Sequence, residues 1–483
     1  MERRTLLATM LAAPVLAPPA LAAAGDTGPY VPETDALVLR KLDDWQDRKF
    51  GFLMHWGAYS QWGVVESWSI CSEDEPWCKR PDGVAYTDYV RRYEKLPETF
   101  NPVAFDPAEW AAIAEGAGMK YVVFTTKHHD GFSMFDTAAT DYRITAPNVP
   151  FHANRQADVT KAIFDAFRAR GFLAGAYFSK ADWHSDDYWW RRFATPNRHA
   201  NYDTRKYSER WQRFRDFTYR QIEELTTGYG PLDILWLDAG WVRPGNTVKE
   251  INGGLPGVPW PQDIDMPRIV AMARCNQPGL IVVDRAVGGP YENYRTPEQT
   301  VPEKPLAYPW ETCMTLGDSW SYAPNDTYKP ARQVVHTLVD VVAKGGNFLL
   351  NVGPDGQGRL PAEAVGRLRE IGDWMKINGR AIYASRAVAP YARQNLRFTQ
   401  LRDGTVYAIR LADEGEHLPP AAIAIPGPAP GAGARVRLLG SDTPLQWRRE
   451  GGVTLVTIPA AVRNELAGAY AWSIELPGAA ADL

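Results

Sequence analysis

Three short segments of the chain combine acidic, basic and aromatic residues at a density that suits chemistry. They are His55-Trp56-Gly57 with Glu66 and Trp68 behind it, Lys127-His128-His129-Asp130-Gly131-Phe132, and Trp236-Leu237-Asp238-Ala239-Gly240-Trp241. The chain has only eight histidines, and three of them fall in these segments. Histidine and glutamate offer hydrogen-bond donors and acceptors, and tryptophan adds a flat apolar face. Together they predict a pocket for a small ligand rich in hydroxyl groups.

The adjacent histidines His128 and His129 raise the alternative of a metal-dependent hydrolase. Along a regular strand neighbouring side chains point to opposite faces, so both rings can hold one metal only if the strand has ended. No third His, Asp or Glu stands at a clear ligand spacing. We therefore expect no metal and no cofactor.

Short runs of apolar or β-branched residues must position these segments. The runs that precede the three segments end at, or shortly before, the first polar residue of each. Such runs are typical of strands buried on both faces, and we expect them at 50–54, 121–126, 172–178, 232–237, 280–283 and 348–352. Helical patterns alternate with them at 32–47, 107–117, 156–170, 207–227, 266–275, 331–343 and 362–376. This alternation predicts an α/β fold with a (β/α)8-like barrel, in which chemistry lies where the strands end.

The pattern changes near residue 386. Residues 396–411 alternate around Asp403-Gly404, and further β-rich runs lie at 435–439, 453–458 and 470–476 without helices between them. Strand runs separated only by Gly and Pro turns predict an antiparallel β-sandwich. We expect the barrel to occupy 30–385 and the sandwich 386–483.

The N-terminus has the pattern of a signal peptide. Arg3 and Arg4 precede an apolar stretch that ends at the small-x-small site Ala20-Leu21-Ala22. The paired arginines are typical of the twin-arginine route. We expect residues 1–24 to be removed and the mature protein to be periplasmic or secreted. In that oxidising compartment Cys71 and Cys78 can close a small loop, although four cysteines allow three full pairings.

The amino-acid composition limits the kinds of partner that the protein is expected to bind. Lys and Arg number 53 against 57 Asp and Glu, and a net charge of -4 predicts no nucleic-acid partner. No apolar run after the N-terminus approaches the ~18–20 residues of a membrane span. The 18 tryptophans are a high count that suits sugar binding, although most of them are expected to fill the core. The oligomeric state stays open.

Five ordered motifs resemble the α-L-fucosidases of glycoside hydrolase family 29. They span about residues 49–385 and are 49–57, 125–132, 235–238, 283–285 and 345–354. The resemblance implies a β/α-barrel-like catalytic domain followed by a β-sandwich, which agrees with the pattern of strands and helices. It implies hydrolysis of terminal α-L-fucosyl residues from a fucosylated oligosaccharide or glycoconjugate, with retention and without a cofactor. A fucose-binding protein that lacks catalysis is an alternative.

The resemblance also implies roles for individual residues. Asp238 matches the position of the catalytic nucleophile. The residues that match the fucose subsite are His55, Glu66, Trp68, His128, His129, Tyr177 and Arg285. In the family the Glu and Trp of the first loop are commonly adjacent, whereas here Ser67 separates them.

The general acid/base of this family lies in a segment that shifts between subgroups. The candidates here are Glu292, Glu298, Glu303 and Glu311. Thr296-Pro297-Glu298 most resembles the segment that supplies the acid in some members, so we choose Glu298. Glu311 is the runner-up, and we expect Glu292 and Glu303 to be solvated loop residues.

Overall fold

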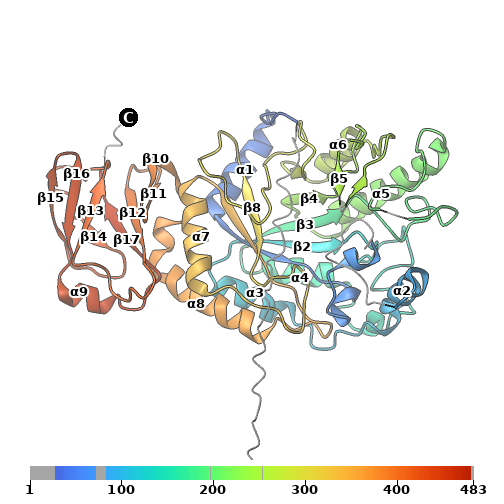
Figure 1. The fold of residues 1–483 in the computed structure, drawn as a ribbon, viewed down its shortest axis with the longest axis horizontal. Helices are drawn as coiled ribbons and strands as arrows, with labels where there is room; N and C mark the ends of the chain where they lie inside the picture. Colours follow the sequence, from blue (N-terminus) through green and yellow to red (C-terminus); the bar gives the residue numbers. More distant parts are fainter. Residues whose placement is uncertain (1–27, 72–82, 196, 253, 480–483) are drawn as a thin grey trace, which may run out of the picture.

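The computed structural model describes residues 28–71, 83–195, 197–252 and 254–479. The expected signal peptide (1–24) and Cys78 lie outside these ranges. The described chain forms a parallel sheet surrounded by helices, followed by antiparallel sheets at one side (Figure 1).

The parallel sheet has seven strands. In spatial order they are β7 (Ile281–Asp284), β4 (Ile234–Asp238), β3 (Leu173–Ser179), β2 (Tyr121–Lys127), β1 (Phe50–Met54), β9 (Asn347–Asn351) and β8 (Glu311–Thr315). Every residue of β1, β2 and β3 is buried, as expected for strands covered on both faces. Ser179 is paired with Asp238, and Leu237 with Asp284, so neighbouring strands end together at one edge.

An irregular segment stands where the eighth strand of a barrel would run, between β7 and β8. The backbone N–H of Asn293 donates to Val282 of β7 (2.9 Å), and that of Gln299 donates to Cys313 of β8 (2.9 Å). The N–H of Glu311 donates in turn to the carbonyl of Arg295 (2.8 Å). Residues 291–299 therefore connect the two edge strands, and they carry Glu298 into the rim.

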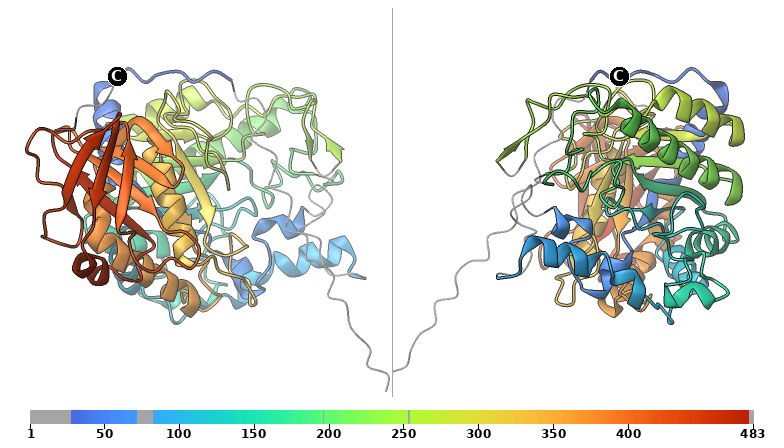
Figure 2. Two further views of the ribbon diagram at one scale, coloured as in Figure 1. Left: turned by 60° about the vertical axis from the view of Figure 1, so that its left-hand side comes forward. Right: turned by 90° about the vertical axis from the view of Figure 1, so that its right-hand side faces the viewer.

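Helices cover the outside of this sheet. They are α1 (Ala36–Arg48), α3 (Pro107–Gly116), α4 (Val159–Arg168), α5 (Ser208–Gly228), α6 (Met266–Asn276), α7 (Ala331–Ala343) and α8 (Ala362–Asn378). Helix α2 (Tyr86–Tyr93) belongs instead to the long connection after β1, where it packs against the turn Ser67–Ile70. Asp106 caps the N-terminus of α3, because its carboxylate accepts from the N–H groups of Ala108 and Glu109. Figure 2 shows α5 and α6 packed side by side. None of the described helices is long and apolar enough to cross a membrane.

The C-terminal part consists of two antiparallel sheets. One contains β10 (Arg386–Arg393), β11 (Leu396–Gln400), β12 (Val406–Leu411), β17 (Ala471–Leu476) and β14 (Arg437–Leu438). The other contains β13 (Ala422–Pro426), β16 (Val453–Thr457) and β15 (Gln446–Glu450), and the short helix α9 is Ala460–Glu465. Phe398 and Ile474 of the first sheet share a core with Ile423 and Val456 of the second. This is the expected β-sandwich, and α7 lies between it and the barrel (Figure 1).

Candidate active site

One pocket of about 150 Å3 at the strand ends collects the two chosen catalytic acids and all the residues that matched the fucose subsite. Its walls include His55, Glu66, Trp68, His128, His129, Tyr177, Asp238, Arg285 and Glu298. These residues come from β1, β2, β3, β4, β7 and the irregular segment, which are far apart in the chain. The convergence follows from the parallel sheet, since the ends of its strands share one edge.

Two of the three acidic residues of the pocket, Asp238 and Glu298, meet at one guanidinium. Arg285 donates from Nη1 to Asp238 Oδ1 (3.1 Å), and its Nη2 contacts Glu298 Oε2. The Nε of Arg285 donates to Thr296 Oγ1 (3.2 Å), which fixes the plane of the guanidinium. Asp238 and Glu298 therefore lie close to each other on the two terminal nitrogens of a single side chain.

The environment of Asp238 keeps its carboxylate ionised. Burial alone would raise its pKa, but Arg285 and the hydroxyl of Tyr177 outweigh burial and hold the pKa well below its ordinary value. Tyr177 Oη donates to Asp238 Oδ2 (2.6 Å), and burial raises the pKa of Tyr177 so that it keeps this proton. Asp238 is consequently a charged group at neutral pH, with its lone pairs partly free for the pocket.

The chain turns sharply after three charged residues of the pocket, Asp238, Arg285 and Glu298. Ala239, Ala286 and Gln299, which follow Asp238, Arg285 and Glu298, have φ angles of 71°, 61° and 54°. Left-handed backbone is strained for residues other than glycine and persists only where the surroundings impose it. These three turns end the strands and the irregular segment abruptly and leave the charged side chains facing the pocket.

His128 and His129 both face the pocket. Strand β2 ends at Lys127, so strand alternation no longer applies to the two rings, whose centroids lie 4.2 Å apart. Within the described ranges, no group of three or more His, Cys, Asp or Glu has the arrangement of a metal site. Burial lowers the pKa of His129 to about 3 and that of His128 well below its ordinary value, so both rings are neutral at neutral pH.

Hydrogen bonds select the tautomers of two histidines. Asn351 Oδ1 accepts from the backbone N–H of His55 (3.2 Å) and lies 2.8 Å from His55 Nδ1, which must carry the proton. Ser179 gives its hydroxyl proton to the Ala181 carbonyl (2.7 Å), so His129 Nδ1 is the donor in the 2.7 Å contact between them. Burial also lowers the pKa of His55, to about 4. Both neutral rings thus keep an unprotonated Nε2 that can accept from a ligand hydroxyl.

Ser67, which separates Glu66 from Trp68, turns the chain so that both still line the pocket. Ser67 begins a 3-10 turn (Ser67–Ile70), and its hydroxyl contacts His128 Nδ1. Burial raises the pKa of Glu66 to about 8, although the N–H of Ser321 donates to its carboxyl oxygen (2.7 Å). Glu66 is therefore mostly protonated at neutral pH and can donate a hydrogen bond.

The other candidate acids lie outside the pocket. Glu311 is completely buried in the barrel, where it accepts from Tyr121 Oη (2.7 Å) and Trp236 Nε1 (3.2 Å), and burial raises its pKa to about 7. Glu303 is exposed, as expected. Glu292 was expected in solvent, but it is buried because it accepts from the N–H groups of Ala286 and Gly288.

Six further residues line the pocket that the sequence did not assign to the site: Leu53, Arg198, Trp236, Trp241, Cys313 and Trp320. Trp236 and Trp241 flank Asp238 in the third segment, and their position already indicated an aromatic wall. The guanidinium of Arg198 lies over the rings of Trp68 (4.8 Å) and Trp241 (5.1 Å). Nothing in the local sequence around Arg198, Cys313 or Trp320 distinguishes them, because they reach the pocket from irregular loops or from an unexpected strand.

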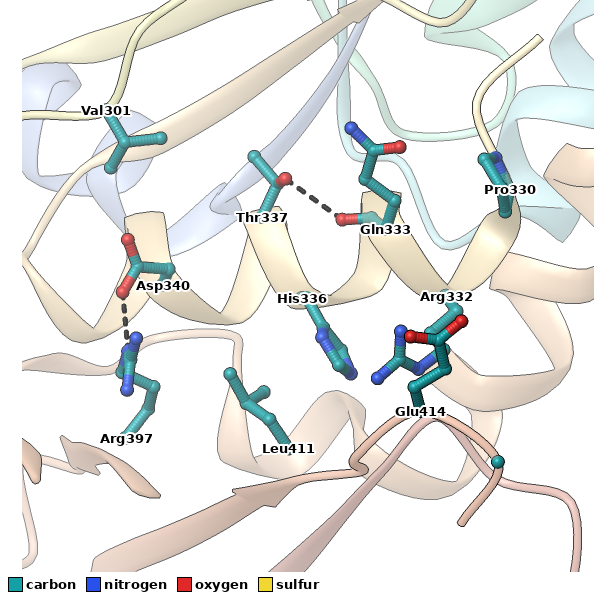
Figure 3. Close-up of a pocket in the computed structure, with 11 residues that line it drawn as sticks. Val301, Pro330, Arg332, Gln333, His336, Thr337, Asp340, Arg397, Leu411 and Glu414 are labelled. Atoms are coloured by element: carbon teal, nitrogen blue, oxygen red, sulfur yellow. Dashed lines mark hydrogen bonds and ion pairs between the residues drawn. The ribbon is translucent and has the colours of Figure 1, made fainter. Parts of the chain in front are cut away.

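A larger hollow of about 730 Å3 lies between α7 and the β-sandwich (Figure 3). It is lined by polar side chains such as His336 and Glu414, and its Asp340 is ion-paired with Arg397. No residue of the smaller pocket lines it. We therefore place the chemistry in the smaller pocket, where the strand ends meet.

A β/α barrel with a close pair of acids and an aromatic wall at its strand ends is typical of the glycoside hydrolase class. A family model described as alpha-L-fucosidase matches residues 19–380, and the chain belongs to that family. It is 27% identical to the human tissue alpha-L-fucosidase over 93% of this chain and 92% of the relative. It is 28% identical to an alpha-L-fucosidase of Dictyostelium discoideum over 80% of this chain and 82% of the relative.

Two solved structures support the same assignment. Alpha-L-fucosidase isoenzyme 1 from Paenibacillus thiaminolyticus is 32% identical, with a TM-score of 0.73 over 92% of this chain and 99% of that one. The Thermotoga maritima alpha-fucosidase, in complex with a mechanism based inhibitor, is 26% identical, with a TM-score of 0.68 over 92% of this chain and 100% of that one. The barrel and the following sandwich are thus the fold of the family.

Proposed function

We propose that this chain is a retaining α-L-fucosidase in which Asp238 is the nucleophile and Glu298 the general acid/base. The observation that carries the proposal is the contact of both acids with the two terminal nitrogens of Arg285. In retaining glycosidases the two carboxyl groups are roughly 5–5.5 Å apart, whereas inverting enzymes leave about 6.5–9.5 Å for a water. A pair held by one guanidinium suits the shorter separation.

The proposed reaction proceeds in two displacements at the anomeric carbon. A carboxylate oxygen of Asp238 bonds to C1 while the bond from C1 to the leaving oxygen breaks, and Glu298 gives that oxygen its proton. Water then attacks C1, Glu298 takes a proton from it, and the ester bond to Asp238 breaks. Two inversions give α-L-fucose and restore both acids, so the reaction needs no external reagent other than water.

The remaining pocket residues match the chemistry of a deoxy sugar. The unprotonated Nε2 atoms of His55 and His129 accept from ring hydroxyls, and protonated Glu66 donates to one. The indole of Trp68, beside the ring of His129 (5.3 Å between centroids), offers an apolar face for C–H groups and the C5 methyl. The site thus distinguishes a polar edge of the sugar from an apolar one.

Product stereochemistry tests the mechanism. We expect the first-formed product of an aryl α-L-fucoside to be α-fucose, which then mutarotates, because two inversions restore the starting configuration. Proton NMR in the first minutes of a reaction at high enzyme concentration measures the anomer directly. β-Fucose as the initial product would exclude the retaining mechanism. Binding of fucose with no hydrolysis of any aryl fucoside would favour the non-catalytic alternative.

We also propose that the chain is exported. We propose in addition that its barrel and sandwich domains divide at residue 386, where β10 begins. The charged start, apolar stretch and Ala20-Leu21-Ala22 site support export. Mass spectrometry of protein from the periplasm and medium should give a mature N-terminus near Ala23. Full-length chain in the cytoplasm, with Met1 still attached, would contradict this proposal.

A further inference from the structure

Two of the strained turns at the pocket lie against each other. Ala239 follows the proposed nucleophile and Ala286 follows Arg285, both with left-handed backbone. A side chain at Gly240 would place its Cβ only 2.9 Å from the carbonyl oxygen of Arg285, so the two turns touch. Each strained residue costs on the order of 1–3 kcal/mol and needs neighbours that hold it in place.

Lys180, which directly follows β3, contacts both turns through its backbone and its side chain. Its backbone N–H donates to the carbonyl of Asp238 (3.1 Å). Its Nζ donates to the carbonyl of Val242 (2.9 Å), at the far side of the turn that contains Ala239. The same ammonium contacts the carboxylate of Asp284, the residue immediately before Arg285.

The Lys180–Asp284 ion pair is almost fully shielded from water, with side-chain exposures of 0% and 4%. A buried ion pair is a costly way to fill a core, since apolar residues of similar volume are often equally stable there. Neither residue lines the pocket. Stability alone therefore gives no clear reason for a charged pair at this point.

We propose that Lys180 and Asp284 are positioning residues, which hold Asp238 and Arg285 in the geometry that the first displacement requires. The proposal rests on the proposed roles of Asp238 and Arg285. Lys180 follows β3 and joins it to β4 through its backbone N–H and to β7 through its ammonium group, so a shift of any of these three strand ends is resisted by the other two. A displacement of about 1 Å at a reacting group is enough to lower turnover by about 100-fold.

The test compares Lys180→Met, Asp284→Ala and Asp284→Asn with the wild type. The concentration of active sites is first measured by trapping with 2-deoxy-2-fluoro-fucosyl fluoride. In this reaction Asp238 bonds to C1 of the sugar, and fluoride leaves from C1. We expect Lys180→Met and Asp284→Ala to lower kcat per trapped site by about 10- to 100-fold, with KM for an aryl fucoside changing less than about threefold. Asp284→Asn should lose less, because its amide oxygen still accepts from Lys180.

Lys41→Met is the matched control. Lys41 is ion-paired with Asp233, the residue before β4, at the opposite end of the nucleophile's own strand. We expect this variant to lower the melting temperature without changing kcat per trapped site, because no turn of the pocket depends on it.

The outcomes separate the two proposals. Normal kcat per trapped site in Asp284→Asn and in every folded variant of the pair, with only the melting temperature lowered, would overturn the positioning role and leave the mechanism intact. If peptide mapping of the trapped wild type finds the label on a residue other than Asp238, the proposed function itself fails. If Lys180→Met and Asp284→Ala do not fold, Asp284→Asn alone decides: a loss of turnover per site at unchanged KM supports the positioning role.

Discussion

Replacing Asp238 by alanine should abolish nearly all turnover while the fold and fucose binding remain. Asp238 is the only pocket carboxylate that both Arg285 and Tyr177 hold in the ionised form. Without it no covalent intermediate forms, and we expect kcat to fall by about four orders of magnitude. Steady-state kinetics on an aryl α-L-fucoside measures the loss, with circular dichroism and fucose titration as controls for folding and binding.

Azide should partly restore activity in the Asp238→Ala variant. The small anion can occupy the space left by the carboxylate and attack C1 from the same side. A single inversion of an α-fucoside then gives β-fucosyl azide, which NMR distinguishes from the α anomer. Near-normal turnover of the variant without azide would remove Asp238 from the role of nucleophile.

Replacing Glu298 by alanine should give a loss that depends on the leaving group. A fucosylated oligosaccharide needs a proton on its leaving oxygen, so we expect kcat/KM to fall by about 10²- to 10⁴-fold. An activated aryl fucoside leaves without that proton, and its kcat/KM should fall far less. For the activated substrate kcat should still fall, because Glu298 no longer activates water to hydrolyse the ester.

Azide also tests whether Glu298, and not a neighbouring glutamate, is the general acid/base. In Glu298→Ala it should attack the ester in place of activated water, giving α-fucosyl azide and a higher kcat. Glu311→Gln and Glu292→Gln are matched controls, since both glutamates are buried and neither lines the pocket. Any loss in these controls should affect both kinds of substrate equally. A leaving-group dependence in Glu311→Gln but not in Glu298→Ala would transfer the acid/base role to Glu311.

The sequence predicted the rim of the barrel well because parallel strands impose their own geometry. Once 50–54, 121–126 and 232–237 are recognised as buried strands, His55, His128 and Asp238 must leave the sheet at the same edge. Strand β1 and helix α7 have the expected bounds, and the other expected strands of the parallel sheet end within one residue of the expected position. Apolar periodicity is sufficient for these elements, since both faces of their strands are covered.

Other elements had no such local pattern. Strand β8 has the sequence Glu-Thr-Cys-Met-Thr, and it is a strand because it pairs with β9 and with the segment around Arg295. Helix α2 lies in a stretch where no helix was predicted, and of its eight residues only Tyr89 and Tyr93 are buried. The burial of Glu292 depends on a turn whose N–H groups need an acceptor, which only the folded chain provides. Such features follow from tertiary contacts and not from periodicity.

The pocket keeps the same total charge throughout the proposed cycle, because Glu298 gains the negative charge that Asp238 loses. Arg285 touches both acids and can be the counter-ion of either. Before attack, Asp238 is the anion, Glu298 holds a proton, and Arg285 is the counter-ion of Asp238. In the ester Asp238 has lost its charge, Glu298 has become the anion, and the same guanidinium is its counter-ion without having to move. The buried pocket therefore never has to hold an uncompensated charge, which would be costly. Neither a mobile ion nor a large reorganisation of solvent is required between the two displacements.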